Sequence, residues 1–206
     1  MYVCWSVKGG SGTSVVACAL AVVLGRERGI GTIVDSAGDA PAILGIPEPV
    51  GLGIHDWLQQ RGGDRMNIDA LRQRCTDSVD LIPRGSAHGA DWGALVGEVE
   101  ASTTVCDFGT QRPPDAIVDE ARADLLVVRA CYLALRRAAR LERPPTGVVL
   151  IEEPGRALVA RDVEVVVRAP VVARVPFDER IARTVDAGLL STRMPDALSG
   201  ALTGVL

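Results

Sequence analysis

The chain has 206 residues and a formal net charge of −4; 48% of its residues are hydrophobic and 3% are aromatic. This length predicts a single domain over residues 1–206, with a core made mainly of Val, Leu, Ile and Ala. The acidic balance argues against a dedicated nucleic-acid-binding protein, and without a long apolar stretch or a basic leader we expect a cytoplasmic protein with no transmembrane segment.

Short apolar runs alternate with helical patterns along the whole chain. The runs that predict strands are 2–7, 32–34, 79–82, 103–106, 125–128, 147–151 and 171–175. The segments that predict helices are 14–28, 54–60, 91–100, 114–121, 132–142, 157–167 and 179–187, while 40–53 is interpreted as a long loop. This alternation predicts an α/β fold with a mostly parallel sheet of about seven strands and helices on both faces. Ligands of such folds bind at the carboxyl ends of the strands.

The first of these carboxyl ends carries a glycine-rich loop, "SVKGGSGTSV", between the first strand and the first helix. Glycines let a backbone turn with positive φ and approach an anion closely, and amides at a helix N-terminus can then converge on phosphates. Ser14 would offer its hydroxyl to Mg²⁺. The loop departs twice from the general phosphate-loop pattern, because Val7 stands at the first glycine position and Thr13 at the lysine position. A plain turn that only starts a helix therefore remains an alternative.

Lys8 is the single lysine in a chain that has 22 lysines and arginines together. A chain that uses arginine wherever a general positive charge suffices has kept one compact ammonium inside this loop. This usage indicates a role for Lys8 that arginine does not fill.

Two aspartates follow other predicted strands, Asp35 after the second and Asp107 after the fourth. Since the carboxyl ends of parallel strands meet at one edge of a sheet, both should lie near the loop. The five cysteines have no metal-ligand spacing and are expected to be reduced thiols.

The loop resembles the deviant phosphate loop of the MinD/ParA family, K-G-G-x-G-K-[ST], with Lys8 at the position of the signature lysine. The segments "TIVDSAGDAPAILGI", "TTVCDFGT" and "APVVARVPFDERIARTVDAG" are similar to the first switch, the Walker B strand and the late base-binding segment of that family. The resemblance covers nearly the whole chain. It implies a P-loop NTPase-like fold, ATP and Mg²⁺ as ligands, and a homodimer in which the signature lysine reaches the partner's phosphates.

The resemblance also implies a set of site residues. Ser14, Asp35 and Asp107 would hold the metal, and Asp35 or Asp39 would be the candidate catalytic carboxylates. The nucleotide would contact Lys8, Gly9, Gly10, Ser11, Gly12, Thr13, Ser14, Val15, Pro176 and Asp178.

Several positions depart from the family pattern. Thr13 replaces the ordinary loop lysine, Val15 replaces a second Thr or Ser, and Ala37 stands where a second switch aspartate orients the attacking water. Asp39 lies two positions later, and Glu152–Glu153 stands near the position of the adenine-contacting Asn. A loop without its lysine resembles the CpaE/TadZ-like branch, which includes septal and pilus-positioning factors.

We therefore expect an ATP-binding protein with weak or no hydrolysis, which acts as a dimeric spatial regulator or scaffold for a cell-division, polar-positioning or secretion machine. It would be recruited from the cytoplasm to a pole, a septum or a membrane-bound complex. Three alternatives remain: a slow Mg²⁺-dependent ATPase completed by Asp39 or a partner, a nucleotide-free pseudo-ATPase, and a partition-type protein that binds DNA non-specifically.

The DNA alternative depends on the arginines of the segment 136–143, namely Arg136, Arg137, Arg140 and Arg143. They form either a solvated helix face or a weak patch for DNA phosphates. The apolar tail "PDALSGALTGVL" has no basic residue, so we do not expect it to form a membrane-binding helix.

Overall fold

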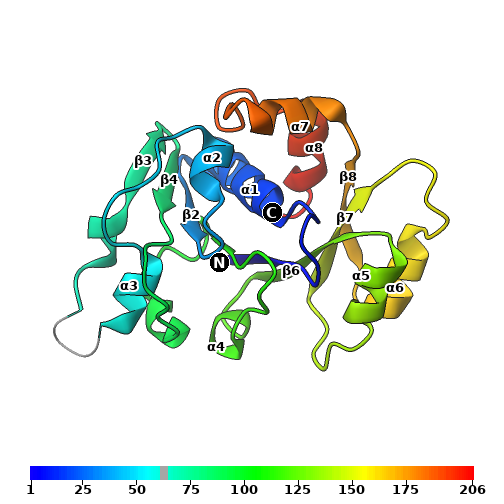
Figure 1. Ribbon diagram of the computed structural model, residues 1–206, viewed down its shortest axis with the longest axis horizontal. Helices are drawn as coiled ribbons and strands as arrows, with labels where there is room; N and C mark the ends of the chain where they lie inside the picture. The colour runs from blue at the N-terminus through cyan, green and yellow to red at the C-terminus, as the bar shows by residue number, and fades with distance from the viewer. Residues whose placement is uncertain (61–64) are drawn as a thin grey trace.

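We examined the protein in a computed structural model, which describes residues 1–60 and 65–206 (Figure 1). Its centre is an eight-stranded sheet with the order β3-β4-β2-β5-β1-β6-β7-β8, in which every pair is parallel except β3 with β4. The strands are β1 (Tyr2–Trp5), β2 (Gly31–Asp35), β3 (Gln73–Thr76), β4 (Val79–Ile82), β5 (Thr104–Asp107), β6 (Ala123–Arg129), β7 (Gly147–Glu152) and β8 (Val171–Pro176). The predicted α/β fold with a mostly parallel sheet is confirmed.

Helices cover both faces of this sheet. One face carries α1 (Thr13–Arg28), α2 (Ala40–Leu44), α7 (Glu179–Asp186) and α8 (Asp196–Thr203). The other carries α3 (Ile54–Gln59), α4 (Asp115–Val118), α5 (Tyr132–Ala138) and α6 (Ala160–Val167). Among the helices of the described ranges, none is both long and apolar enough to cross a lipid bilayer.

The central strand β1 shows how the sequence divides the core into two layers. Successive side chains of a strand point to opposite faces. Val3 and Trp5 therefore pack into the core beneath α3 to α6, while Tyr2 and Cys4 pack into the core around α1. All four are buried, which explains why the run is continuously apolar and does not alternate.

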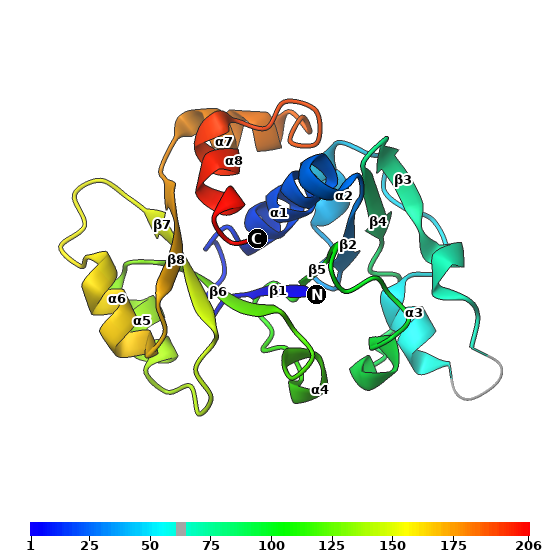
Figure 2. The same ribbon diagram turned by 180° about the vertical axis from the view of Figure 1, so that it is seen from behind.

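Helix α1 is buried almost all round from Thr13 to Gly25. The C-terminal helix α8 packs against it, and its Leu198 and Leu202 are fully buried there (Figure 2). The tail that we interpreted as a short apolar segment is thus a helix of the core. It packs against α1, the helix that follows the glycine-rich loop.

Three other expectations need correction. The segment 40–53 contains the short helix α2, whose Pro41 sits at a favoured helix start and whose Gly45 ends it with φ of 74°. The helix expected over 91–100 is only a 3₁₀ turn, Trp92–Leu95, because Gly97 has φ of 87° and ends it. Strand β3 adds an antiparallel edge that we did not expect.

Gly31 shows how closely α1 packs on the sheet. A Cβ at Gly31 would lie 1.9 Å from the Ala21 carbonyl oxygen of α1. We expect Gly31→Ala to lower the free energy of unfolding by about 3 kcal/mol, because α1 must shift to admit the methyl group. The matched change is Gly200→Ala in α8, where a Cβ meets nothing within 4 Å. It should raise stability by about 0.5–1 kcal/mol through helix propensity. Urea unfolding of both variants checks this, and equal effects would contradict it.

Candidate functional site

The glycine-rich loop forms one wall of an open pocket of about 610 Å³ at the carboxyl edge of the sheet. Gly10 and Gly12 have φ of 74° and 87°, the conformations that the glycines were expected to supply. Residues 9–14 all line the pocket, and Val15 lies beside them. The loop is therefore open toward the pocket and is not collapsed onto the core.

The amides of this loop are free to bind an anion. Among the backbone hydrogen bonds of the described residues, the first bond at the start of α1 runs from Val16 N to Gly12 O, at 2.9 Å, and none is donated by Gly9, Gly10, Ser11 or Gly12. The next amides belong to the first turn of α1, where a helix leaves its N–H groups without partners. The conformation of the loop is stabilised by the Ser6 and Ser11 hydroxyls, which donate to the Lys8 carbonyl at 3.0 and 2.7 Å.

Lys8 does not line this pocket. Its ammonium donates to the neighbouring Gly9 carbonyl at 3.0 Å on the exposed side of the loop. The Val7 carbonyl just before it accepts from Arg137 Nη1 of α5 at 3.0 Å. Within its own chain Lys8 is thus displaced from the space in which phosphates would lie.

Asp107 ends β5 next to the start of α1 and is completely buried. Its Oδ1 accepts from the Gly109 amide at 2.9 Å, whereas Oδ2 has no partner among the described residues. Burial raises the pKa of Asp107 to about 6; the nearby Ser14 hydroxyl, which is not within hydrogen-bond geometry of it, and the Gly109 amide oppose the rise. A buried carboxylate oxygen without a donor is costly unless something absent from the protein alone completes it.

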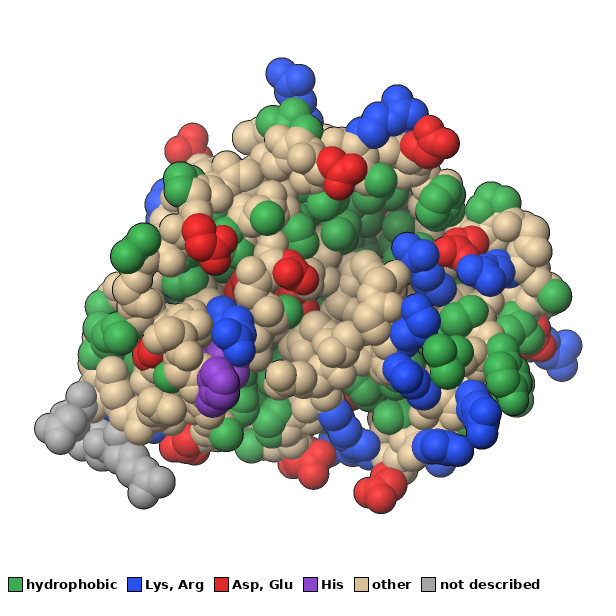
Figure 3. All heavy atoms as spheres, viewed as in Figure 1, with side chains coloured by type: hydrophobic (Ala, Val, Ile, Leu, Met, Phe, Trp, Pro, Cys, Tyr) green, Lys and Arg blue, Asp and Glu red, His purple; other side chains and the backbone are tan. Residues whose placement is uncertain are grey.

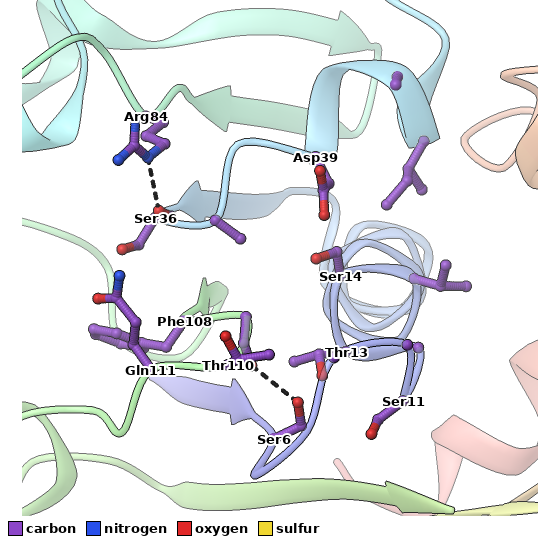
Figure 4. A pocket seen from close by; sticks show the side chains of 18 residues that line it. Ser6, Ser11, Thr13, Ser14, Ser36, Asp39, Arg84, Phe108, Thr110 and Gln111 are labelled. Carbon is purple, nitrogen blue, oxygen red and sulfur yellow. Dashed lines mark hydrogen bonds between the residues drawn. The ribbon is translucent and has the colours of Figure 1, made fainter.

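Asp35 ends the neighbouring strand β2 and has a different environment. Its oxygens accept from the amides of Gly38, at 2.6 Å, and Ala40, at 3.0 Å. These bonds hold the turn that leads into α2, and the metal role of Asp35 stays a prediction. Asp39 lies at the end of this turn and lines the pocket, with its carboxylate directed toward Ser14 (Figure 4).

The rest of the pocket lining contains side chains that sequence reasoning missed, with Arg84 and Ser36 across from the loop and Thr110 beside it. Arg84 follows β4, Ser36 follows β2, and Thr110 and Gln111 follow β5; all four line the pocket (Figure 4). Behind Ser36, the buried His55 has its Nε2 at 3.1 Å from the Ser36 hydroxyl and its Nδ1 at 2.9 Å from the Gly89 carbonyl. The sequence pointed to these residues as site residues only through their positions just after predicted strands.

A second groove, of about 260 Å³, adjoins the first through Ser11, Gly12 and Val15. Its far end is lined by Pro176, Phe177 and Asp178, so the structure brings the predicted late segment next to the loop. Asp178 caps α7 by accepting from the Arg180 amide at 2.8 Å, and the Arg180 guanidinium holds its pKa below the usual value.

The groove also holds two residues that the sequence did not indicate as site residues. Phe177 is 55% exposed and lines the groove. Arg129 pairs with Glu153 at 2.8 Å, but its Nε is buried and has no partner within the described part of the chain. Glu153, which the sequence places near the position of an adenine-contacting residue, is thus engaged in ion pairs with Arg129 and Arg156.

The arginines of the segment 136–143 lie over α5 and just after it, where Figure 3 shows Lys and Arg side chains gathered beside the central hollow. Arg143 pairs with Asp119 at 2.6 Å and with Asp115 at 3.8 Å. Arg136 and Arg140 have no ion-pair partner among the residues that the structure describes. Whether this face contacts DNA stays a prediction.

Comparison with known proteins agrees with this geometry. No protein-family model matches the sequence, and no curated protein resembles it closely enough to count as a match. Among solved structures, a chain of the MinC:MinD cell division protein complex of Aquifex aeolicus is 19% identical, with a TM-score of 0.79 over 98% of this chain and 92% of that chain.

Two further structures have the same fold. A ParA family ATPase from Chlorobium tepidum is 20% identical, with a TM-score of 0.73 over 98% of this chain and 95% of that chain. The septum site-determining protein MinD of Pyrococcus horikoshii, solved with Mg-ADP, is 17% identical, with a TM-score of 0.75 over 99% and 93%. These likenesses show that the fold is the one used by MinD/ParA ATPases.

Proposed function

We propose that the protein belongs to the MinD/ParA family and binds ATP with weak or no hydrolysis, as a nucleotide-dependent dimeric regulator of position. One observation carries this proposal: the loop of positive-φ glycines keeps its amides unpaired on the wall of an open pocket. The adjoining groove continues the pocket toward Pro176 and Asp178, so phosphates and a base would have separate places on the two sides of Gly12.

The residues present fit a magnesium ion bound with the nucleotide. Mg²⁺ prefers oxygen ligands and is usually held by one or two carboxylates together with substrate phosphates. Ser14 lines the pocket and would supply a hydroxyl. Asp107, which is buried behind that lining, would supply Oδ2, an oxygen that has no partner among the described residues. The ion would supply charge neutralisation between phosphate oxygens.

The groove lined by Phe177 fits a purine base. Its aromatic ring and the apolar side chains of Val15 and Ile181 would form a surface for stacking. Arg129, whose Nε has no partner among the described residues, also lines the groove. Among the described residues, the buried side-chain polar atoms without a hydrogen-bond partner are this nitrogen and Asp107 Oδ2. Both residues lie at the ends of strands that border the loop.

Weak ATP hydrolysis is expected from the residues that stand at the lysine position and at the water-orienting position. Phosphoryl transfer depends on positioning and on neutralising charge. Thr13 gives no charge at the lysine position, and Ala37 gives no carboxylate to orient water. A slow ATPase is a second candidate because the Asp39 carboxylate faces Ser14 across the pocket.

A role in dimerisation follows from the placement of Lys8. Its ammonium lies on the exposed side of the loop and outside its own pocket, which suits contact with the phosphates of a partner copy. We propose that ATP closes such a dimer in the cytoplasm. The dimer would then be recruited to a pole, a septum or a membrane-bound complex by a protein of a division, positioning or secretion machine.

We expect Lys8→Ala to weaken nucleotide-dependent dimerisation by at least about tenfold, the loss of one charge-assisted hydrogen bond, and Thr13→Ala to weaken it by less than about threefold. Sedimentation velocity with Mg²⁺ and a non-hydrolysable ATP analogue measures this. Calorimetric titration of each variant is the control, because Lys8→Ala should still bind nucleotide through the loop amides.

Equal behaviour of the two variants would remove the role of Lys8. A wild-type protein that binds no nucleotide in the high micromolar range would favour the pseudo-ATPase instead. Phosphate release measured with and without a partner separates the slow ATPase from the nucleotide-dependent scaffold.

A further inference from the structure

The phosphate pocket contains one cationic side chain, and it is not on the loop. Of the residues that line the pocket, all within the described ranges, Arg84 is positively charged and Asp39 is negatively charged. A nucleoside triphosphate brings several negative charges, and the position that normally offsets them is occupied by Thr13. The charge must come from elsewhere if a triphosphate is to be held.

Arg84 is held firmly at its backbone. Its carbonyl accepts from the His55 amide at 3.1 Å, and the preceding Pro83 carbonyl accepts from the Ile54 amide at 2.7 Å. Gly53 packs so closely here that a Cβ on it would lie 2.2 Å from the Gly85 nitrogen. The start of α3 therefore fixes where the Arg84 side chain leaves the strand.

The Arg84 side chain is also held in one orientation, while its two terminal nitrogens stay available as donors. Arg84 Nε donates to the Ser36 carbonyl at 3.2 Å. Within the described part of the chain, no hydrogen bond or ion pair occupies its two terminal nitrogens. A guanidinium fixed through Nε can present both of these nitrogens to one phosphate group.

The position of Arg84 determines which of the three phosphates of ATP it could contact. Figure 4 shows Arg84 and Ser36 on the wall across from Thr13 and Ser14. A phosphate loop surrounds the inner phosphates, so only the outermost phosphate extends toward the opposite wall. We infer that Arg84 binds the terminal phosphate of ATP, in the same chain, and supplies the charge that the loop lacks. This inference deepens the proposed function and rests on it.

The test is the affinity of Arg84→Ala for a non-hydrolysable ATP analogue and for ADP, each with Mg²⁺, by calorimetry. We expect the affinity for the analogue to fall about 10- to 100-fold, the value of a hydrogen-bonded charge, and that for ADP to change less than about threefold. Arg112→Ala is the matched control, because Arg112 is an exposed loop arginine near the pocket that does not line it. It should change neither affinity by more than about twofold.

A second variant separates binding from folding. Arg84→Ala combined with Thr13→Lys should regain the preference for the analogue over ADP, because the cation returns on the opposite wall. Thermal unfolding without ligand shows whether each variant is folded.

The outcomes distinguish the two hypotheses. Equal losses for both nucleotides, or no loss, would overturn the role of Arg84 while leaving nucleotide binding intact. A wild-type protein that binds neither nucleotide would overturn the proposed function itself.

Discussion

Replacing Thr13 by lysine is expected to tighten the binding of Mg²⁺ with a non-hydrolysable ATP analogue by about 10- to 100-fold. Thr13 is the first residue of α1, is 6% exposed and lines the pocket beside the glycine-rich loop. Because the Thr13 side chain lines the pocket, a lysine there would direct its ammonium into the space beside the loop amides, where phosphates would lie. The gain would come from a charge-assisted hydrogen bond in a partly dry site.

The same change should cost stability without ligand. A cation at a helix N-terminus opposes the helix dipole, which lowers the free energy of unfolding by about 0.3–1 kcal/mol. The two effects have opposite signs, so thermal unfolding with and without the analogue separates them. Thr13→Met is the matched control, because it adds length without charge.

Calorimetry that finds Thr13→Lys no tighter than Thr13→Met would contradict a phosphate site at this loop. Phosphate release should remain slow in Thr13→Lys, because Ala37 still provides no carboxylate to orient water. Fast release in this variant would favour the slow ATPase, in which Asp39 completes the site.

Replacing Asp107 by asparagine is expected to stabilise the ligand-free protein and to abolish the effect of Mg²⁺ on nucleotide binding. The native carboxylate is buried, and its Oδ2 has no donor in the part of the chain that the structure describes. Removing that charge should raise the free energy of unfolding by about 1–3 kcal/mol at pH 8.

The pH dependence has a definite sign. Burial raises the pKa of Asp107 from 3.8 to about 6, so the native state binds this proton more tightly than the unfolded chain. The contribution of Asp107 to stability therefore falls as the pH rises from about 4 to about 6 and is constant above that range. The advantage of Asp107→Asn should be full at pH 8 and absent below about pH 4.

Asp35→Asn is the matched control for this experiment. Both oxygens of Asp35 accept from backbone amides, so an amide nitrogen in place of one oxygen would face another donor. Burial raises the pKa of Asp35 as well, but its two amide donors oppose the rise, so Asp35→Asn should be less stable at pH 8 than Asp107→Asn. Urea unfolding at pH 5 and pH 8 and titrations with Mg²⁺ or with a chelator check the two effects. An Asp107→Asn protein that is destabilised at pH 8, or that still responds to Mg²⁺, would contradict the assignment.

Much of the fold could be predicted because the buried strands are continuous apolar runs. Strand β3 could not, because Gln73–Thr76 is a half-exposed edge whose polar residues show no alternation. Helix α8 was missed because its apolar face is short, and its burial depends on α1, a partner that the local pattern does not show.

The loop and the two aspartates at strand ends could be placed near one another because parallel strands share an edge. Arg84 could not be identified in this way. Its relation to Ser36 depends on β4 lying beside β2, and on the close approach of Gly53 that turns the chain there. Phe177 and Arg129 likewise come together only through the order of the last three strands.

The contact between Gly45 and Gly188 links the two ends of the proposed nucleotide site. Gly45 ends α2, which follows the turn at Asp39, and Gly188 follows α7, which begins after Asp178. A Cβ on Gly45 would lie 1.8 Å from the Gly188 carbonyl oxygen, so backbone touches backbone with no side chain between to absorb movement. We therefore expect a movement of the turn at Asp39 to shift α7 as well, because the two backbones are in direct contact.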